Sequence, residues 1–152
     1  NAGAVVIEAC SPVHAEQGKS ISGQRVLVVE DGPTLTHGGM KYGAGTLAAK
    51  QYGAKEIIDP RPWLTGTLVD TFKKYPEIGN LLPAMGYGNE QIRDLEQTIN
   101  KSDCDLVVIG TPIDLARVIN IQKPSVRVTY ELEEVGTPNL ETILKPFIDN
   151  VV

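Results

Sequence analysis

Short apolar runs along the chain alternate with longer stretches in which apolar residues recur at helical spacing. Residues 25–29 (RVLVV) and 105–109 (DLVVI) are nearly continuous apolar runs, which are typical of parallel strands covered on both faces. Three weaker runs, at residues 5–7, 55–58 and 80–84, predict further strands. Residues 125–132 alternate between apolar and polar positions, and we predict an edge strand there.

Helices are expected between these strands. Gly53 ends the first predicted helix, and Asn89 and Asn139 are good N-caps for the helices that begin at residues 90 and 140. The predicted helices are residues 44–52, 65–75, 90–100, 115–119 and 140–150. Repeated β-α units with short connections imply an α/β fold, a Rossmann-like three-layer sandwich with a mostly parallel sheet.

Composition and charge narrow the classes of partner. The 152 residues are 41% hydrophobic and 22% charged, which suits one ordinary globular domain. A net charge of −5 argues against a nucleic-acid partner. The chain has no run of about 18 apolar residues and no signal peptide, so we expect a cytoplasmic protein with no membrane partner.

The cysteines and histidines do not predict a metal site. Cys10 follows one predicted strand and Cys104 precedes another, so both are expected to be buried, reduced thiols. The chain has no CxxC pair, and His14 and His37 share no ligand spacing. The triplet at residues 18–20 (GKS) resembles the end of a P-loop, but no helix has room to follow it, so we expect a turn.

Glycine-rich polar loops follow four of the predicted strands. The carboxyl ends of parallel strands share one edge of a sheet, where ligands bind. The longest loop, residues 30–45, combines flexible glycines with donors, a lysine and a helix start near Ala44, which suits a phosphate or carboxylate. Alternatively, its glycines only fold a long crossover loop. The groups expected at the anion are Thr34, Thr36, His37, Gly38, Gly39 and Lys41.

Two acidic residues open this loop. Glu30 and Asp31 are placed to hold Mg²⁺ or to accept a proton, or instead to cap backbone N–H groups in the turn. Asp31 and His37 are therefore the candidate catalytic residues. We expect Arg61, held between two prolines, either to meet an anion or to remain a plain surface arginine.

Three residues after the later strands complete the candidate site. Tyr87 is suited to stacking on a ring. Thr111 offers a hydroxyl in the loop after residues 105–109. Asp114 lies where a helix begins, so it either contributes to the site or caps that helix.

At the long loop the sequence resembles the C-terminal region of predicted P-loop GTPases related to cyclic 2,3-diphosphoglycerate synthetase. The similarity extends from about Ala4 over nearly the whole chain. Five ordered motifs carry it: RVLVVEDGPTLTHGGMKYGAG, EIIDPRP, LPAMGYG, CDLVVIGTPIDLARVI and VRVTYELEEVG.

The resemblance implies a C-terminal fragment of a longer protein, and the absence of an initiator Met agrees with that expectation. Residues 1–152 would form a single α/β domain. Within it, residues 1–23 would end the preceding nucleotide-binding segment and residues 24–152 would be the C-terminal Rossmann-like domain. Ala9, Cys10 and Ser11 would lie near a nucleotide base.

The resemblance also implies chemistry that this chain does not perform alone. The Walker A loop, the metal-binding aspartate and the base-reading motif have no counterpart here, so the fragment itself is expected to hold no cofactor and to be inactive. Mg²⁺ with GTP or ATP is expected in the intact protein, an NTPase or ATP-dependent ligase. The expected partners are a small phosphorylated or carboxylated metabolite and the rest of the chain. Alternatives are a binding module for a phosphometabolite or nucleotide, or a scaffold domain that forms a homodimer.

Overall fold

The computed structural model describes residues 3–36, 40–86 and 88–149. They form two compact units. The α/β unit comprises residues 13–129, and the chain-end unit comprises residues 3–12 together with 130–149. The boundary near residue 24, which the family resemblance implies, stays a prediction.

The α/β unit is built on a mostly parallel sheet. Its central strand, β3, pairs in parallel with β4 and β5 along one edge and with β6 along the other, and β6 pairs in parallel with β7. β2 lies next to β7 at the far edge. The strands are β2 (Val13–Ala15), β3 (Arg25–Asp31), β4 (Glu56–Ile57), β5 (Leu82–Ala84), β6 (Leu106–Ile109) and β7 (Ser125–Tyr130).

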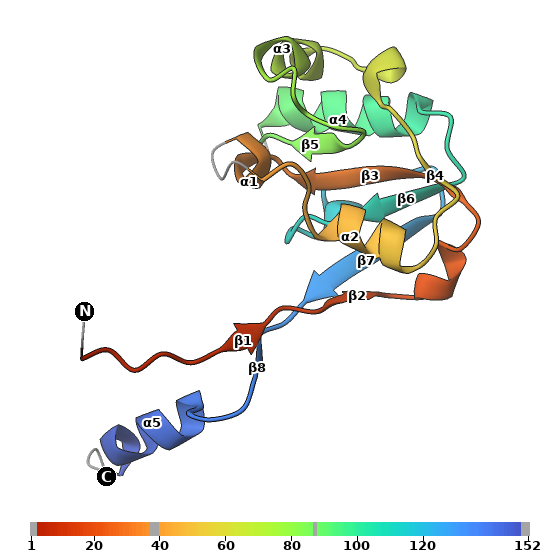
Figure 1. The fold of residues 1–152 in the computed structure, drawn as a ribbon. Coiled ribbons are helices and arrows are strands. Elements are labelled where there is room, and N and C mark those ends of the chain that lie inside the picture. The colour runs from red at the N-terminus through yellow and green to blue at the C-terminus, as the bar shows by residue number, and fades with distance from the viewer. Residues whose placement is uncertain (1–2, 37–39, 87, 150–152) are drawn as a thin grey trace. The chain divides into compact units, whose positions relative to one another are not determined.

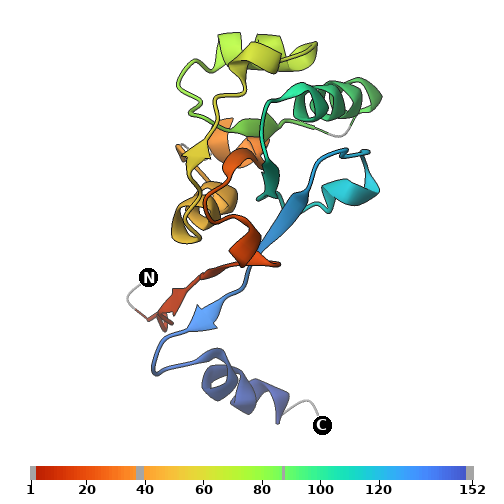
Figure 2. The ribbon, with the colours of Figure 1, turned by 90° about the vertical axis from the view of Figure 1, so that its right-hand side faces the viewer.

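Helices cover both faces of this sheet, as Figures 1 and 2 show: α2 lies on one side, and α3 and α4 lie on the other. The helices are α1 (Gly32–Thr36), α2 (Ala44–Gln51), α3 (Thr67–Lys74) and α4 (Asn89–Lys101). Shorter 3₁₀ turns are η1 (Gly18–Ser20), η2 (Arg61–Trp63) and η3 (Leu115–Arg117). The predicted α/β three-layer architecture is therefore confirmed.

The core follows the apolar pattern of the sequence. Val26–Val29 of β3 and the whole of β6 are buried, because helices lie over both of their faces. On α4, Leu95 and Ile99 point into the core, and Ile92 packs against it, as the helical spacing predicts. The GKS triplet forms η1, which confirms the expected turn.

The chain-end unit has a different construction. β1 (Ala9–Cys10) and β8 (Glu133–Glu134) form an antiparallel pair. α5 (Leu140–Ile148) begins after Asn139, whose side chain accepts a hydrogen bond from the N–H of Thr142 at 2.8 Å. The predicted N-cap at Asn139 is confirmed.

The prediction of a strand at residues 5–7 is wrong. The strand near the start of the chain is β1, and only Ala9 and Cys10 find partners on β8. A β-branched run favours a strand only where a neighbouring strand can pair with it.

Cys10 is exposed and Cys104 is half-buried, so the expectation of buried thiols is wrong for Cys10; both cysteines are free.

Other differences are local. The loop after β3 contains the short helix α1, and β2 lies where no strand was expected. α4 begins one residue early, at Asn89, because the extended Gly88 occupies the N-cap position. The side chain of Gln91 accepts from the Gly88 N–H at 3.4 Å. The predicted helix at 115–119 is the single 3₁₀ turn η3.

Candidate functional site

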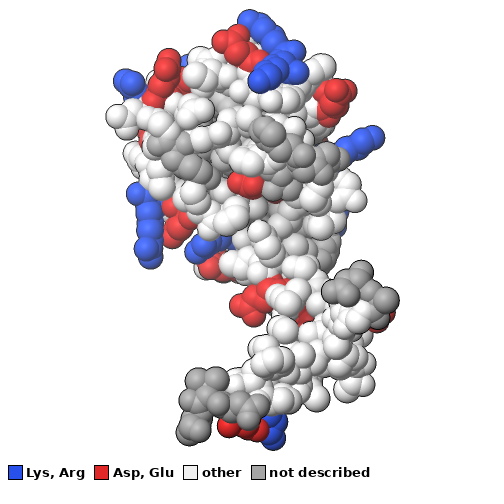
Figure 3. Space-filling model, turned by 90° about the vertical axis from the view of Figure 1, so that its left-hand side faces the viewer, with Lys and Arg blue, Asp and Glu red and all other residues white. Residues whose placement is uncertain are grey.

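Three of the four loops singled out in the sequence begin at one edge of the sheet, which we call the carboxyl rim. In the parallel register Val29 lies opposite Ile109, and Asp31 lies opposite Ala84. The segments that follow β3, β5 and β6 therefore start side by side. Figure 3 looks onto this rim.

The centre of the rim is the point at which the chain changes direction. After β3 the chain crosses toward β4 and β5, whereas after β6 it crosses to β7 on the opposite side of the sheet. In open α/β sheets, ligands bind in the crevice at such a switch point. At the switch point of this sheet, Glu30 of β3, Gly110 after β6 and the N-terminus of α2 pack closely together.

The carboxylate of Glu30 fills the N-terminus of α2. Glu30 is only 1% exposed. Its Oε1 accepts hydrogen bonds from Gly43 N (3.1 Å), Thr46 N (2.7 Å) and Thr46 Oγ1 (2.9 Å). Its Oε2 accepts from Gly45 N (3.2 Å).

This carboxylate stands where a helix N-terminus would otherwise receive an external anion. Burial raises the pKa of Glu30, because desolvation disfavours the charged form, while the hydrogen bonds from Thr46, Gly45 and Gly43 act in the opposite direction. Of the alternatives for Glu30, backbone capping is the one observed. The sequence predicted that the start of this helix faces an anion. Its N–H donors, on Gly43, Gly45 and Thr46, are instead hydrogen-bonded to a carboxylate of the protein itself.

Two glycines allow α2 to approach the sheet this closely. A Cβ on Gly110 would lie 2.4 Å from Gly45 N and 2.5 Å from Glu30 Oε2. A Cβ on Gly45 would lie 2.9 Å from Val28 Cγ1. Only glycine fits at these positions without displacing the helix, so the glycines after β3 and β6 have a packing role here.

Asp31, Thr36 and Thr111 lie at the carboxyl rim. Asp31 is half-buried at the end of β3, and Thr36 Oγ1 donates to the carbonyl of Gly32 at 3.0 Å within α1. Thr111 is 1% exposed just after β6. Its Oγ1 accepts from the Ile113 N–H at 3.4 Å.

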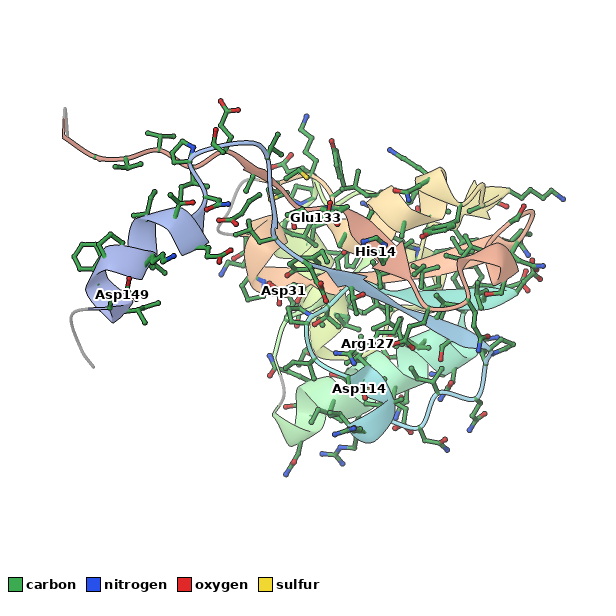
Figure 4. All side chains as sticks on the ribbon, turned by 90° about the horizontal axis from the view of Figure 1, so that it is seen from below. His14, Asp31, Asp114, Arg127, Glu133 and Asp149 are labelled. Atoms are coloured by element: carbon green, nitrogen blue, oxygen red, sulfur yellow. The ribbon has the colours of Figure 1, made fainter. Side chains whose placement is uncertain are left out.

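Asp114 lies further along the same loop, in the N-cap position of η3, but its side chain does not cap that turn. It forms an ion pair with Arg117 at 3.1 Å. Figure 4 labels Asp31 at the end of β3, Asp114 before η3 and Arg127 on β7.

Arg61 lies away from the carboxyl rim. β4 pairs with Arg25 and Val26 at the start of β3, so the segment after β4 begins well before the rim. The guanidinium of Arg61 bonds to Asp59 at 2.9 Å and to the carbonyl of Ile78, and stacks over Phe72 at 5.0 Å. These contacts tie η2 to the segment between α3 and β5.

Lys41 is exposed and borders two shallow hollows. One, of about 170 Å³, is lined mainly by apolar residues, including Leu35 and Tyr75. The other, of about 280 Å³, also contains Lys50, whose ammonium group lies 5.3 Å from the ring centre of Tyr42. Cationic charge therefore gathers beside α2.

The remaining expected residues fall into three groups. Ala9, Cys10 and Ser11 are exposed and belong to the chain-end unit. The backbone of Thr34 lies in α1. The residues outside the described part of the chain are His37, Gly38, Gly39 and Tyr87.

Arg127 was not identified from the sequence. It lies on β7, opposite Ile109, and its Nη2 donates to the carbonyl of Pro112 at 3.2 Å. Its Nε is buried and has no hydrogen-bond partner among the described residues. The only signal in the sequence was its place between the apolar positions Val126 and Val128 of an alternating strand.

Residues 3–36, 40–86 and 88–149 contain neither a candidate metal cluster nor a candidate membrane-spanning helix. No group of three or more His, Cys, Asp or Glu side chains in these ranges is arranged to hold a metal ion. No helix there combines the length and apolarity needed to cross a bilayer.

Comparison with known proteins gives a close sequence relative. No protein-family profile matches the chain, and no solved structure matches it. The chain is 59% identical over 150 residues, 99% of its length, to the arginine synthetase ArcE of Thermococcus kodakarensis. It spans about a third (34%) of the length of that relative.

Proposed function

We propose that this chain acts as the Rossmann-like domain of an arginine synthetase of the ArcE type. The observation that carries the proposal is the 59% identity to that synthetase over 99% of the chain. Identity at this level, spread over the whole α/β unit, is expected to preserve the rim as well as the core. The carboxyl rim is then the part of this domain that meets the substrate.

The rim has groups suited to such a reaction. A synthetase that makes arginine forms a bond to nitrogen, so the attacking nitrogen must lose a proton. Asp31, at the end of the central strand, is our candidate to accept it. Glu30 has the separate task of holding Gly43 and the start of α2 in place. In the intact protein, ATP or GTP with Mg²⁺ would be bound mainly outside this chain.

A second candidate function comes from the hollow beside α2. The resemblance to cyclic 2,3-diphosphoglycerate synthetase suggests a phosphorylated acceptor, and Lys41 and Lys50 share a hollow of about 280 Å³. Two ammonium groups suit a phosphorylated metabolite. On this alternative the intact protein joins phosphate groups rather than making arginine.

The test uses a full-length protein in which this chain replaces the matching segment of the Thermococcus kodakarensis synthetase. Arginine is measured by amino-acid analysis after incubation with citrulline, ammonia and ATP or GTP, and nucleotide consumption is measured with 2,3-diphosphoglycerate in place of citrulline. We expect arginine formation that depends on the nucleotide. If nucleotide is consumed only with 2,3-diphosphoglycerate and no arginine forms, the second candidate replaces the first.

A further inference from the structure

The chain-end unit carries an apolar surface without a core of its own. Every buried hydrophobic residue in the described chain lies between Val13 and Val128, within the α/β unit. In contrast, α5 has no buried residue. The chain-end unit therefore exposes apolar side chains that a folded protein usually covers.

α5 is amphipathic along its whole length. Glu141, Lys145 and Asp149 recur at four-residue spacing on one side. Leu144 is 46% exposed and Phe147 is 68% exposed on the other. The complete apolar stripe, at spacings of three and four, is Leu140, Ile143, Leu144, Phe147 and Ile148.

The segments beside α5 add to this surface. Tyr130, Leu132 and Val135 are exposed on the segment that leads to α5, and Val5 and Val6 are exposed on the other chain segment. A nine-residue helix and a pair of two-residue strands are each too small to be stable in water without cover. Stable order in this unit therefore calls for a partner surface.

Charge identifies the kind of partner. The chain-end unit holds six of the chain's 19 acidic residues and one of its 14 basic residues, which gives the unit a net charge of −5. The 13 acidic and 13 basic residues of the α/β unit cancel. The acidic residues of the chain-end unit, some of them visible in red in Figure 3, are Glu8, Glu131, Glu133, Glu134, Glu141 and Asp149.

We propose that the chain-end unit is a docking surface for an apolar patch with a basic rim, supplied by the part of an ArcE-type protein that lies outside the matched 150 residues. About two thirds of the Thermococcus relative lies outside that match, which provides the covering chain. A second copy of this chain fits less well, because it would bring two units of net charge −5 together.

Hydrogen exchange tests this docking surface in two samples: the chain alone, and the full-length protein in which the chain replaces the matching segment of the Thermococcus synthetase. We expect the amides of residues 143–145, 147 and 148 to exchange about tenfold or more slowly in the full-length protein. Leu144→Asp should restore fast exchange there. The matched control is Leu47→Asp on α2, since Leu47 is 42% exposed and Leu144 is 46% exposed.

Two outcomes would overturn the proposal. Equal exchange of α5 in both samples would mean that nothing covers it. Slow exchange in the chain alone, together with a dimer in sedimentation that Leu144→Asp dissociates, would assign the surface to a second copy. Should the hybrid protein not assemble, the same peptide of the intact Thermococcus synthetase gives the exchange readout. The assay measures no arginine, so it is independent of the proposed activity.

Discussion

The two units of this chain have opposite physical designs. The α/β unit buries a sheet between helices, and its 13 acidic and 13 basic residues cancel. The chain-end unit buries no hydrophobic residue among those described and carries the whole net charge of −5. The contrast indicates that one unit is stable by its own packing, whereas the other is built to meet a partner.

The largest expected difference between the units is in core truncation. Leu27→Ala removes a fully buried side chain from β3 and should lower the free energy of unfolding by about 2–5 kcal/mol. Leu144→Ala on α5 should change it by less than about 0.5 kcal/mol in the isolated chain. Urea unfolding measures both variants. Equal losses would mean that the chain-end unit has a hydrophobic core of its own.

A second substitution tests the packing of α2 at the rim. Gly110→Ala puts a methyl group 2.4 Å from Gly45 N and 2.5 Å from Glu30 Oε2. The substitution should lower the free energy of unfolding by about 1–3 kcal/mol. Gly79 is the matched control, since a Cβ there would meet nothing within 4 Å. Thermal unfolding should leave Gly79→Ala close to wild type. A neutral Gly110→Ala would show that α2 is free to move away from β6.

Removing the ionisable group at Glu30 tests the carboxylate that caps α2. In Glu30→Gln, a side-chain N–H group faces a backbone N–H donor. The substitution should therefore lower the free energy of unfolding by about 1–2 kcal/mol at low pH. Since burial raises the folded-state pKa of Glu30, the folded state holds that proton more tightly than the unfolded state does.

The stability of wild type relative to Glu30→Gln should therefore be greatest below about pH 4, the unfolded value. It should fall as pH rises through the folded pKa and then level off. Denaturant unfolding from pH 3 to 8 measures this difference. A difference that grows with pH would mean that the four hydrogen bonds outweigh burial.

The smallest effect is expected in the chain-end unit. Asn139→Ala removes the side chain that accepts from Thr142 N at 2.8 Å, and should destabilise α5 locally by about 1 kcal/mol. The global unfolding midpoint should stay unchanged, because α5 contributes no buried residue. Amide exchange of residues 143–145, 147 and 148 reports the local change. A shift of the global midpoint would couple α5 to the core.

Most of the α/β unit was predictable from apolar patterning. Residues 25–29 and 105–109 are nearly continuous apolar runs, which are typical of parallel strands covered on both faces. The helical spacing of the apolar residues in α4 predicted which side of that helix is buried. Residues 5–7 show the limit of this reasoning. They have strand propensity, but a strand exists only where pairing partners are available, and the sequence does not state them.

The rim was predictable only in part. Parallel topology placed the segments of Asp31 and Thr111 together, as expected. The place of Arg61 was not predictable in the same way, because the strand before it pairs with the beginning of β3 and not with its end. Propensity contains no information on register. Glu30 was ambiguous because a carboxylate beside a glycine-rich segment can bind a ligand or the helix itself, and only coordinates separate the two.

The most direct test of the proposed function compares two half-buried aspartates, one at the rim and one away from it. In the full-length hybrid protein, Asp31→Asn should lower the turnover of arginine formation by about 10²-fold or more while leaving the unfolding midpoint nearly unchanged. Asp59→Asn, after β4, should leave turnover within about twofold of wild type. Equal turnover in Asp31→Asn and wild type would contradict the account.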